Sequence, residues 1–305
     1  MPLSSCPAVS VVIATYNRAN FLAETLNSVL DQTFQDFELI VVDDGSTDDT
    51  ANVLSTYGSR IRCFRQSNRG PSAARNLGVQ HALAPWIAIQ DSDDLSAPNH
   101  LELLHGYVRN HPDCAMVFAN GGYISGIEHN RETIIPQKKS LRLAADGVRL
   151  ADLFDKSIVR LQAALISRRC YDAVGGHDES LRISMDLDLT FRLFAKYPIV
   201  YLDAVVFSYR KHPGNISGDH EMRLLENIRV IEKLVRELPQ AEILLGKRRV
   251  HARVAYRYYR LAKTRFKQGK RADARTALNS AVSLSPFNPK YRLYQLQWRA
   301  SLSRN

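Results

Sequence analysis

The fold of this chain is decided by the stretch VSVVIATYNR at residues 9–18. Its first six residues are mostly β-branched and apolar, as in a short strand that is buried on both faces. Two similar runs, ELIVV at 38–42 and WIAI at 86–89, also lead directly into polar residues, DDGS at 43–46 and DSDD at 91–94. Each of these predicted strands therefore ends in a polar loop.

Helical patterns separate the predicted strands. Apolar residues recur at helical spacing over 21–30, capping residues precede 50–57, and Ser72 could cap a helix that runs to about residue 83. Alternating strands and helices over residues 8–120 predict an α/β fold with a mainly parallel sheet. Ligands bind at the carboxyl ends of such strands, so we expect the polar loops to converge at one edge of the sheet.

The rest of the chain has less regular patterns. Between residues 115 and 209 they predict strands at 115–119, 163–166 and 199–209 and one amphipathic helix at 184–195. From residue 220 onward the pattern is almost wholly helical, so the expected domains are 1–218 and 219–305. Residues 258–286 have the spacing of a single tetratricopeptide-type helix pair, with an ordinary helical hairpin as the alternative.

Composition excludes several classes of protein. With 305 residues, 45% of them hydrophobic, the chain can bury a substantial core. The four cysteines lie roughly fifty residues apart without a CxxC pair, which argues against a disulfide framework and a zinc site. No apolar run reaches the ~18 residues of a membrane span, and the first eight residues do not resemble a signal peptide. A cytoplasmic location is therefore expected.

The net charge of +10 is unevenly distributed. Residues 219–305 carry 20 Lys and Arg against 7 Asp and Glu, a balance of +13, and the totals of 41 and 31 leave 21 against 24, or −3, for residues 1–218. About 1 kcal/mol per basic residue near an anionic leaflet favours peripheral association of these helices with a membrane surface at its inner face. A solvated helical face is the alternative. Nucleic acid is not expected as a partner, because no known binding module accompanies the charge.

The candidate chemistry lies in the acidic loops. GxGxxG and Walker patterns are absent from the sequence, so neither a nicotinamide nor a P-loop site has its usual motif. Asp91 and Asp93, two residues apart just after a strand, suit a divalent cation held against a diphosphate. An acidic loop alone is more often solvated surface.

The ordered set of motifs is far more specific. VSVVIATYNR, DFELIVVDDGSTDDT (36–50), NRGPSAARNLG (68–78) and QDSDD (90–94) closely resemble family 2 glycosyltransferases, which are inverting enzymes with the GT-A fold. GGHDESLRISMDLDLTFRL (175–193) and YRKHPGNIS (209–217) extend the resemblance to roughly residues 8–218. It implies a Rossmann-like GT-A domain, with a mixed, mainly parallel sheet flanked by helices, followed by a helical appendage. The implied reaction moves a sugar from a nucleoside diphosphate to a hydroxyl of a saccharide or lipid-linked acceptor.

The resemblance also implies a donor site. The residues matched to the nucleotide pocket are Thr15, Tyr16, Arg18, Asp43, Asp44, Arg75 and Asp91. Asp44 is matched to the base contact, and a carboxylate can accept a hydrogen bond from N3–H of uracil or thymine, which favours a UDP- or dTDP-sugar. A turn and helix-cap role for Asp43 and Asp44 is the structural alternative, and both roles can hold together. The resemblance places Arg75 toward the nucleotide and Asp91 near the ribose.

The metal and the catalytic base follow from the same comparison. Asp93 is matched to a ligand of Mn²⁺ or Mg²⁺, and His212 to a residue near the metal or the diphosphate. Asp186 is matched to the base that removes the acceptor proton in a single inverting displacement. The family has a Glu before this Asp, whereas this chain has Met185. The structural alternative for Asp186 and Asp188 is that both acids are favoured by the dipole at a helix start.

Two other functions compete with this interpretation. The first is a non-catalytic scaffold on a degenerate transferase fold, which Met185 supports and the intact acids oppose. The second is nucleotidyl transfer, which would normally show a glycine-rich loop after the first strand, where this chain has Thr15-Tyr16-Asn17-Arg18.

Overall fold

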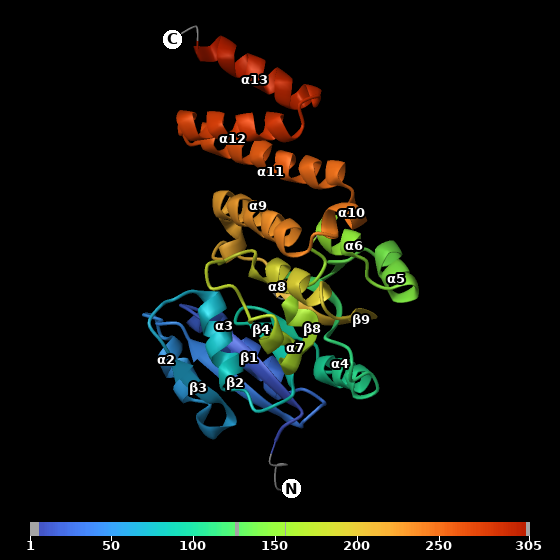
Figure 1. Cartoon of the computed structure of the whole chain (residues 1–305). Helices are drawn as coiled ribbons and strands as arrows, with labels where there is room; N and C mark the ends of the chain where they lie inside the picture. The colour runs from blue at the N-terminus through green and yellow to red at the C-terminus, as the bar shows by residue number, and fades with distance from the viewer. Residues whose placement is uncertain (1–5, 126–127, 156, 303–305) are drawn as a thin grey trace. The chain divides into compact units, whose positions relative to one another are not determined.

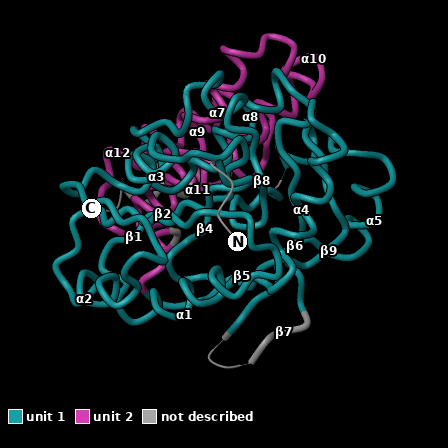
Figure 2. The backbone as a smooth tube through the Cα atoms, turned by 90° about the horizontal axis from the view of Figure 1, so that it is seen from below, with its two compact units in different colours: residues 1–213 teal, residues 214–305 magenta. Residues whose placement is uncertain are grey.

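The structure is a computed structural model that describes residues 6–125, 128–155 and 157–302. It divides into two compact units, residues 1–213 and residues 214–305, which Figure 2 shows in teal and magenta. The division falls in the loop after the last strand of the first unit, just before the boundary expected at residue 218.

Unit 1 is built on a mixed sheet with the strand order β3-β2-β1-β4-β8-β6-β9-β5, and β7 pairs with β6. The strands before the first reversal are β1 (Val9–Thr15), β2 (Phe37–Asp43), β3 (Arg62–Arg65) and β4 (Trp86–Asp91). The remaining strands are β5 (Leu95–Ser96), β6 (Met116–Ser125), β7 (Glu128–Thr133), β8 (Ala164–Ser167) and β9 (Ile199–Arg210). β1 to β4 pair in parallel, and β8 joins β4 antiparallel. The predicted α/β fold with a mixed, mainly parallel sheet is confirmed.

Helices cover both faces of this sheet. α1 (Ala19–Leu30) and α4 (His100–Arg109) pack in the core that contains Val11 and Ile13 of β1. α3 (Pro71–Gln80) packs on β1 and β2, and Figure 1 shows it beside these strands. The approach is close because a Cβ at Gly78 would lie 2.4 Å from Val12 Cγ1. Only glycine fits there without a shift of the helix.

The start of α3 differs from its predicted form. Gly70, with φ +93°, takes the position before the helix, and Pro71 begins it. The Ser72 hydroxyl donates to the carbonyl of Leu181 at 2.6 Å. Ser72 therefore ties α3 to a distant segment, and the prediction that it caps the helix is wrong.

The other helices of unit 1 complete the two layers. They are α2 (Thr50–Ser55), α5 (Gln137–Asp146), α6 (Leu150–Asp155), α7 (Arg168–Ala173) and α8 (Met185–Phe194), with a short 3-10 turn, η2, at Leu161–Ala163. α8 lies where the sequence predicted an amphipathic helix, and its buried residues include Leu187, Leu189 and Leu193.

Unit 2 is helical. Its helices are α9 (His220–Glu237), α10 (Ala241–Leu245), α11 (Lys247–Lys267), α12 (Arg271–Leu284) and α13 (Pro289–Leu302). α11 and α12 form a hairpin whose turn contains Gly269 at φ +77°, and Ala262, Ala274 and Ala281 are fully buried between them. These small residues at the predicted spacing let the two helices pack closely. None of the described helices has both the length and the hydropathy needed to cross a membrane.

Candidate active site

The carboxyl ends of three parallel strands bring the polar loops together. In the sheet register Thr15 of β1 lies opposite Asp43 of β2, and Ala14 lies opposite Asp91 of β4. The loops that follow β1, β2 and β4 therefore share one edge of the sheet, as the alternating sequence pattern predicted.

The loop after β1 offers polar groups to this edge. The Thr15 hydroxyl oxygen is buried and has no hydrogen-bond partner among the described residues, and Tyr16 is 43% exposed. Asn17 adopts φ +52°, and its side-chain oxygen accepts a hydrogen bond from the amide of Thr47 at 2.8 Å. Arg18 Nε donates to Asp93 Oδ2 at 3.3 Å. A buried hydroxyl without a partner fits a ligand that would complete its hydrogen bonding.

Asp43, the last residue of β2, and Asp44, which follows it, are both buried and well satisfied. Asp43 Oδ1 accepts from the amide of Ser46 at 2.8 Å, which is the turn role considered above. Asp44 accepts from Gln66 Nε2 at 2.7 Å, from the amide of Arg69 at 2.9 Å and from that of Gly70 at 2.8 Å. Asp44 thus ties the 66–70 loop to the end of β2, and its contact with a nucleotide base stays a prediction.

Arg75 links the two halves of the site. It is buried on α3, where Nη2 donates to Asp91 Oδ1 at 2.5 Å and Nη1 donates to Asp186 Oδ1 at 3.0 Å. Burial disfavours the charge of the guanidinium, but the two carboxylates outweigh this and raise the pKa of Arg75 above its ordinary value. The residues matched to the ribose contact and to the catalytic base are therefore bridged by one permanent cation.

The acids after β4 form a compact cluster. One carboxylate oxygen from each of Asp91, Asp93 and Asp94 lies within 4.8 Å of the other two. Burial raises the pKa of Asp91, with Asp186 and Asp93 adding to the shift against the opposing charge of Arg75. Burial, together with Asp91 and Asp93, also raises the pKa of Asp94 well above its ordinary value. Carboxylates that resist ionising together are a donor set that a divalent cation would relieve.

Gln162 and Arg210 hold this cluster in place. The Gln162 amide, on η2, donates to Asp91 Oδ2 and, at 3.3 Å, to Asp94 Oδ2. The backbone amide of Arg210 donates to Asp94 Oδ1 at 2.9 Å. Gln162 lies outside every motif quoted above, so only the folded chain reveals it. Asp94 was visible in the sequence as the last acid of DSDD, but its burial was not.

His212 lies against the same cluster. Its Nε2 is 2.9 Å from Asp93 Oδ2, and its ring packs on Phe21 with the ring centroids 4.5 Å apart. Asp93 therefore lies between Arg18 from the first loop and His212 from the loop after β9. The structure brings these predicted residues together on one carboxylate.

α8 places its two acids in different surroundings. Asp186 lies in the first turn, bonded through Oδ1 to Arg75, and its side chain is 19% exposed. Asp188 is 2% exposed and bonds to Arg192, with Nε at 2.8 Å and Nη2 at 2.5 Å from Oδ2. Met185, at the family's Glu position, is buried, and its sulfur lies 3.3 Å from the Ser72 hydroxyl. Asp188 and Met185 thus serve the fold, whereas Asp186 faces the site.

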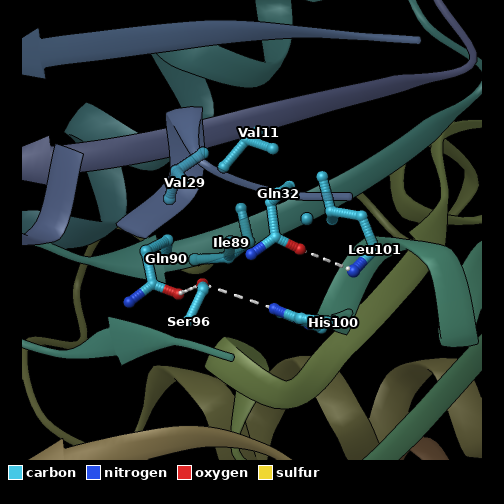
Figure 3. A pocket seen from close by; sticks show the side chains of 9 residues that line it. Val11, Val29, Gln32, Ile89, Gln90, Ser96, His100 and Leu101 are labelled. Atoms are coloured by element: carbon cyan, nitrogen blue, oxygen red, sulfur yellow. Dashed lines mark hydrogen bonds between the residues drawn. The ribbon is translucent and has the colours of Figure 1, made fainter. Parts of the chain in front are cut away.

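A small buried cavity lies elsewhere in unit 1 and is shown in Figure 3. Val11, Val29 and Leu101 line it together with Gln32, Gln90, Ser96 and His100. His100 Nδ1 lies 3.4 Å from the Ser96 hydroxyl, and burial lowers the pKa of His100 to about 4. The imidazole is therefore neutral at physiological pH. The cavity contains none of the carboxylates described above and belongs to the core.

Comparisons with known proteins agree with this architecture. The family described as Glycosyl transferase family 2 matches residues 10–169. A protein of Rickettsia felis named as an uncharacterized glycosyltransferase is 30% identical over 217 residues, which are 68% of this chain and 35% of that protein. The chain thus spans about a third of the length of that relative.

Solved structures resemble the chain in fold. S. aureus TarS 1–349 in complex with UDP-GlcNAc has a TM-score of 0.66 at 19% identity and covers 91% of this chain and 81% of its own. The mannosyltransferase PcManGT of Pyrobaculum calidifontis, in complex with GDP-Man and Mn²⁺, has a TM-score of 0.62 at 18% identity over 98% and 81%. The match to the family covers more than half of the sequence and includes the loops after β1, β2 and β4. This chain therefore belongs to glycosyl transferase family 2.

Proposed function

We propose that this chain is a metal-dependent, inverting glycosyltransferase that moves a sugar from a UDP- or dTDP-sugar to a hydroxyl of a saccharide or lipid-linked acceptor. The observation that supports this most is the position of Arg75, whose guanidinium bonds to both Asp91 and Asp186. Asp91, which is matched to the donor ribose, and Asp186, which is matched to the catalytic base, are separated by this one side chain. Donor binding and acceptor activation can then meet at one anomeric carbon.

The donor site draws on the three strand-end loops. Thr15 supplies a buried hydroxyl without a partner, Tyr16 an exposed ring for the base, and Asp44 a carboxylate that reads a single donor such as N3–H. Arg18 and Arg75 supply positive charge for a diphosphate. The complex of TarS with UDP-GlcNAc, a protein of similar fold, supports a nucleotide-sugar donor.

A divalent cation, Mn²⁺ or Mg²⁺, would be held by Asp93 with Asp91, Asp94 and His212. Three carboxylates that can meet within 4.8 Å, beside an imidazole, fit such an ion. The cation would stabilise the charge of the departing diphosphate. The complex of PcManGT, a protein of similar fold, with GDP-Man and Mn²⁺ supports a divalent cation in this site.

Asp186 acts as the general base. Its Oδ1 is fixed by Arg75 at 3.0 Å, and Oδ2 has no hydrogen bond among the described residues. The free oxygen accepts the proton of the acceptor hydroxyl as that hydroxyl attacks the anomeric carbon from the face opposite the diphosphate. One displacement gives the inverted anomer. Met185 removes a neighbouring charge from the acceptor side but leaves this step intact.

Unit 2 has an exposed surface that we propose contacts a membrane. Ile243 on α10 is 82% exposed and Leu244 is 65% exposed, and the exposed basic residues Lys247, Arg248 and Arg249 follow at the start of α11. Two aliphatic side chains beside three cations suit the interface of an anionic membrane. We therefore place the protein in the cytoplasm, peripheral on the inner face of the membrane, where lipid-linked acceptors are available.

Nucleotide binding tests the donor and the metal together. Thermal unfolding is measured with UDP, dTDP, GDP and CDP, each with and without Mn²⁺, for the wild type, Asp93→Ala and the exposed-acid control Asp113→Ala. A ligand at 100 times its Kd stabilises by about 2.7 kcal/mol. We expect UDP or dTDP with Mn²⁺ to stabilise the wild type and Asp113→Ala, and Asp93→Ala to lose the metal-dependent part. Equal metal-dependent stabilisation of Asp93→Ala would contradict the assignment.

A further inference from the structure

One arginine of unit 2, Arg257, has a side-chain donor that lacks a hydrogen-bond partner. Arg257, in the middle of α11, is partly buried, and its Nε atom is shielded from solvent without a hydrogen-bond partner. No carboxylate forms an ion pair with Arg257 among the described residues. A donor taken out of water without a partner costs about 1–3 kcal/mol, so the fold retains this arginine at a loss of stability.

Two other arginines lie near Arg257. Burial lowers the pKa of Arg257, and the charges of Arg223 and Arg260 lower it further. α9 packs on α11, and Arg223 of α9 bonds to the His220 ring at 2.6 Å. Arg260, one turn beyond Arg257, donates to the Tyr256 hydroxyl at 3.1 Å. Neither contact involves a carboxylate, so neither supplies a negative charge to Arg257.

The acids of α9 do not pair with Arg257. Glu226 is buried and is engaged with another group. Glu221 accepts from Arg265 at 2.8 Å and from Lys270 at 2.9 Å. Glu232 contacts the Tyr258 hydroxyl at 3.5 Å, and Glu237 lies 3.7 Å from Arg236. The hydrogen bond from Arg260 lowers the pKa of Tyr256, and the charges of Lys290 and Arg257 act in the same direction. The face around Arg257 therefore has a positive potential that this chain's own side chains do not neutralise.

We propose that Arg257, with Arg223 and Arg260, forms a binding site for a phosphate group on unit 2. Guanidinium groups match phosphate oxygens in pairs, and a phosphate would contact the Nη groups of Arg257, which are not shielded as Nε is, and would supply the missing negative charge. The site uses no residue of the carboxylate cluster of unit 1 and does not depend on the proposed reaction. The phosphate can come from a lipid headgroup or from a soluble ion.

The test compares the full chain with Arg257→Gln, with Arg260→Gln, and with the exposed-arginine control Arg275→Gln on α12. Inorganic phosphate is titrated against chloride at equal ionic strength, and Tm and the calorimetric Kd are measured. At ten times its Kd, phosphate should raise the Tm of the wild type and of Arg275→Gln by about 3 °C. Arg257→Gln should bind phosphate at least about tenfold more weakly, because a charge-assisted contact is lost.

Arg257→Gln has a second expected signature. Without phosphate its Tm should exceed that of the wild type, because the variant no longer shields the unpartnered Nε–H donor and no longer places a third positive charge beside Arg223 and Arg260. Phosphate bound in unit 1 would raise the Tm of wild type and variant equally, so only the difference between them reports on this site. Equal phosphate affinity in wild type and Arg257→Gln, or no phosphate effect on the wild type, would overturn the proposal.

Vesicles identify the source of the phosphate. The same proteins are sedimented with phosphatidylcholine vesicles with and without phosphatidylglycerol. A lipid headgroup is the ligand if Arg257→Gln reduces binding to the anionic vesicles and free phosphate competes with them. A soluble phosphate is the ligand if the two arginine variants, at 257 and 275, bind vesicles equally while only the first loses affinity for inorganic phosphate.

Discussion

Charged side chains pair with opposite charges at the acidic edge of the sheet in unit 1, whereas one arginine on the basic helices of unit 2 does not. In unit 1, Arg75 bridges Asp91 and Asp186, while Arg18 and His212 contact Asp93. In unit 2, Arg257 has no acidic partner among the described residues. Under our two proposals, unit 1 is organised in advance for its ligands, whereas in unit 2 a bound anion would balance the charge of Arg257.

The comparison also separates positions that carry chemistry from positions that carry stability. Asp186 and Asp188 lie two residues apart on α8, yet one has a free oxygen at the site and the other is enclosed with Arg192. Variants of these acids and of the basic helices can therefore test the contrast.

The largest effect, on turnover, is expected at Asp186, the proposed general base. Asp186→Asn keeps the size of the side chain but cannot accept the acceptor proton, so turnover should fall by about two to four orders of magnitude. Donor binding should survive, because Arg75 can still bond to the amide oxygen. Steady-state kinetics with the identified donor, and calorimetry of nucleotide binding, measure both quantities. Near-normal turnover where chemistry limits the rate, or a product with retained configuration, would remove Asp186 from this role.

Asp188→Asn should reverse that pattern. It leaves Arg192 as an uncompensated buried charge, which should lower the free energy of unfolding by about 3–5 kcal/mol. Urea unfolding monitored by circular dichroism gives this value, and activity per folded molecule should stay close to that of the wild type. If activity collapses while stability is unchanged, the two acids have exchanged roles.

Acid should act on unit 1 through His100. Its pKa is about 4 in the folded protein and about 6.5 when unfolded, so between these values only the unfolded chain is protonated. Stability is therefore retained above about pH 6.5 and lost as the pH falls toward 4. This one group predicts a loss of about 2 kcal/mol between pH 7 and pH 5. His100→Gln should reduce the loss in urea unfolding at the two pH values, and an unchanged loss would assign it to other groups.

The smallest effect is expected in the tail. Replacing Lys247, Arg248 and Arg249 by Gln should weaken salt-sensitive binding to anionic vesicles and leave Tm almost unchanged, since these side chains are exposed. Replacing Lys267, Arg271 and Arg275 removes the same charge at the other end of the α11–α12 hairpin and serves as the control. Equal vesicle binding by the two triple variants would mean that overall charge, and not the start of α11, attracts the membrane.

Much of unit 1 follows from local patterns. The β-branched runs predict β1, β2 and β4, because strands buried on both faces need continuous apolar residues. The polar residues directly after them predict the position of the site. Gln162 could not be found in this way, because it reaches Asp91 and Asp94 from a segment about seventy residues away that carries no motif. The same applies to Ser72, whose partner Leu181 is distant in sequence.

Unit 2 was less predictable for a related reason. Its helices and its charge could be read from the sequence, since helical periodicity and composition are local properties. The state of Arg257 depends on which side chains of α9 face α11, and sequence spacing on α11 alone does not determine that. From the sequence alone the arginines of unit 2 could not be told apart. The folded helices distinguish the solvated arginines from Arg257, whose Nε is shielded and has no partner.

The loop contacts of Asp44 set a limit on how a base can be read. A carboxylate has about four lone-pair positions, and Gln66 and the amide of Arg69 occupy both on Oδ1. The amide of Gly70 occupies one on Oδ2. A single acceptor position remains, so in the proposed contact with a nucleotide base Asp44 would accept one hydrogen bond and no more. The one imide N–H of uracil or thymine would match that position, whereas guanine presents an N1–H and an amino group side by side and would find an acceptor on Asp44 for only one of them.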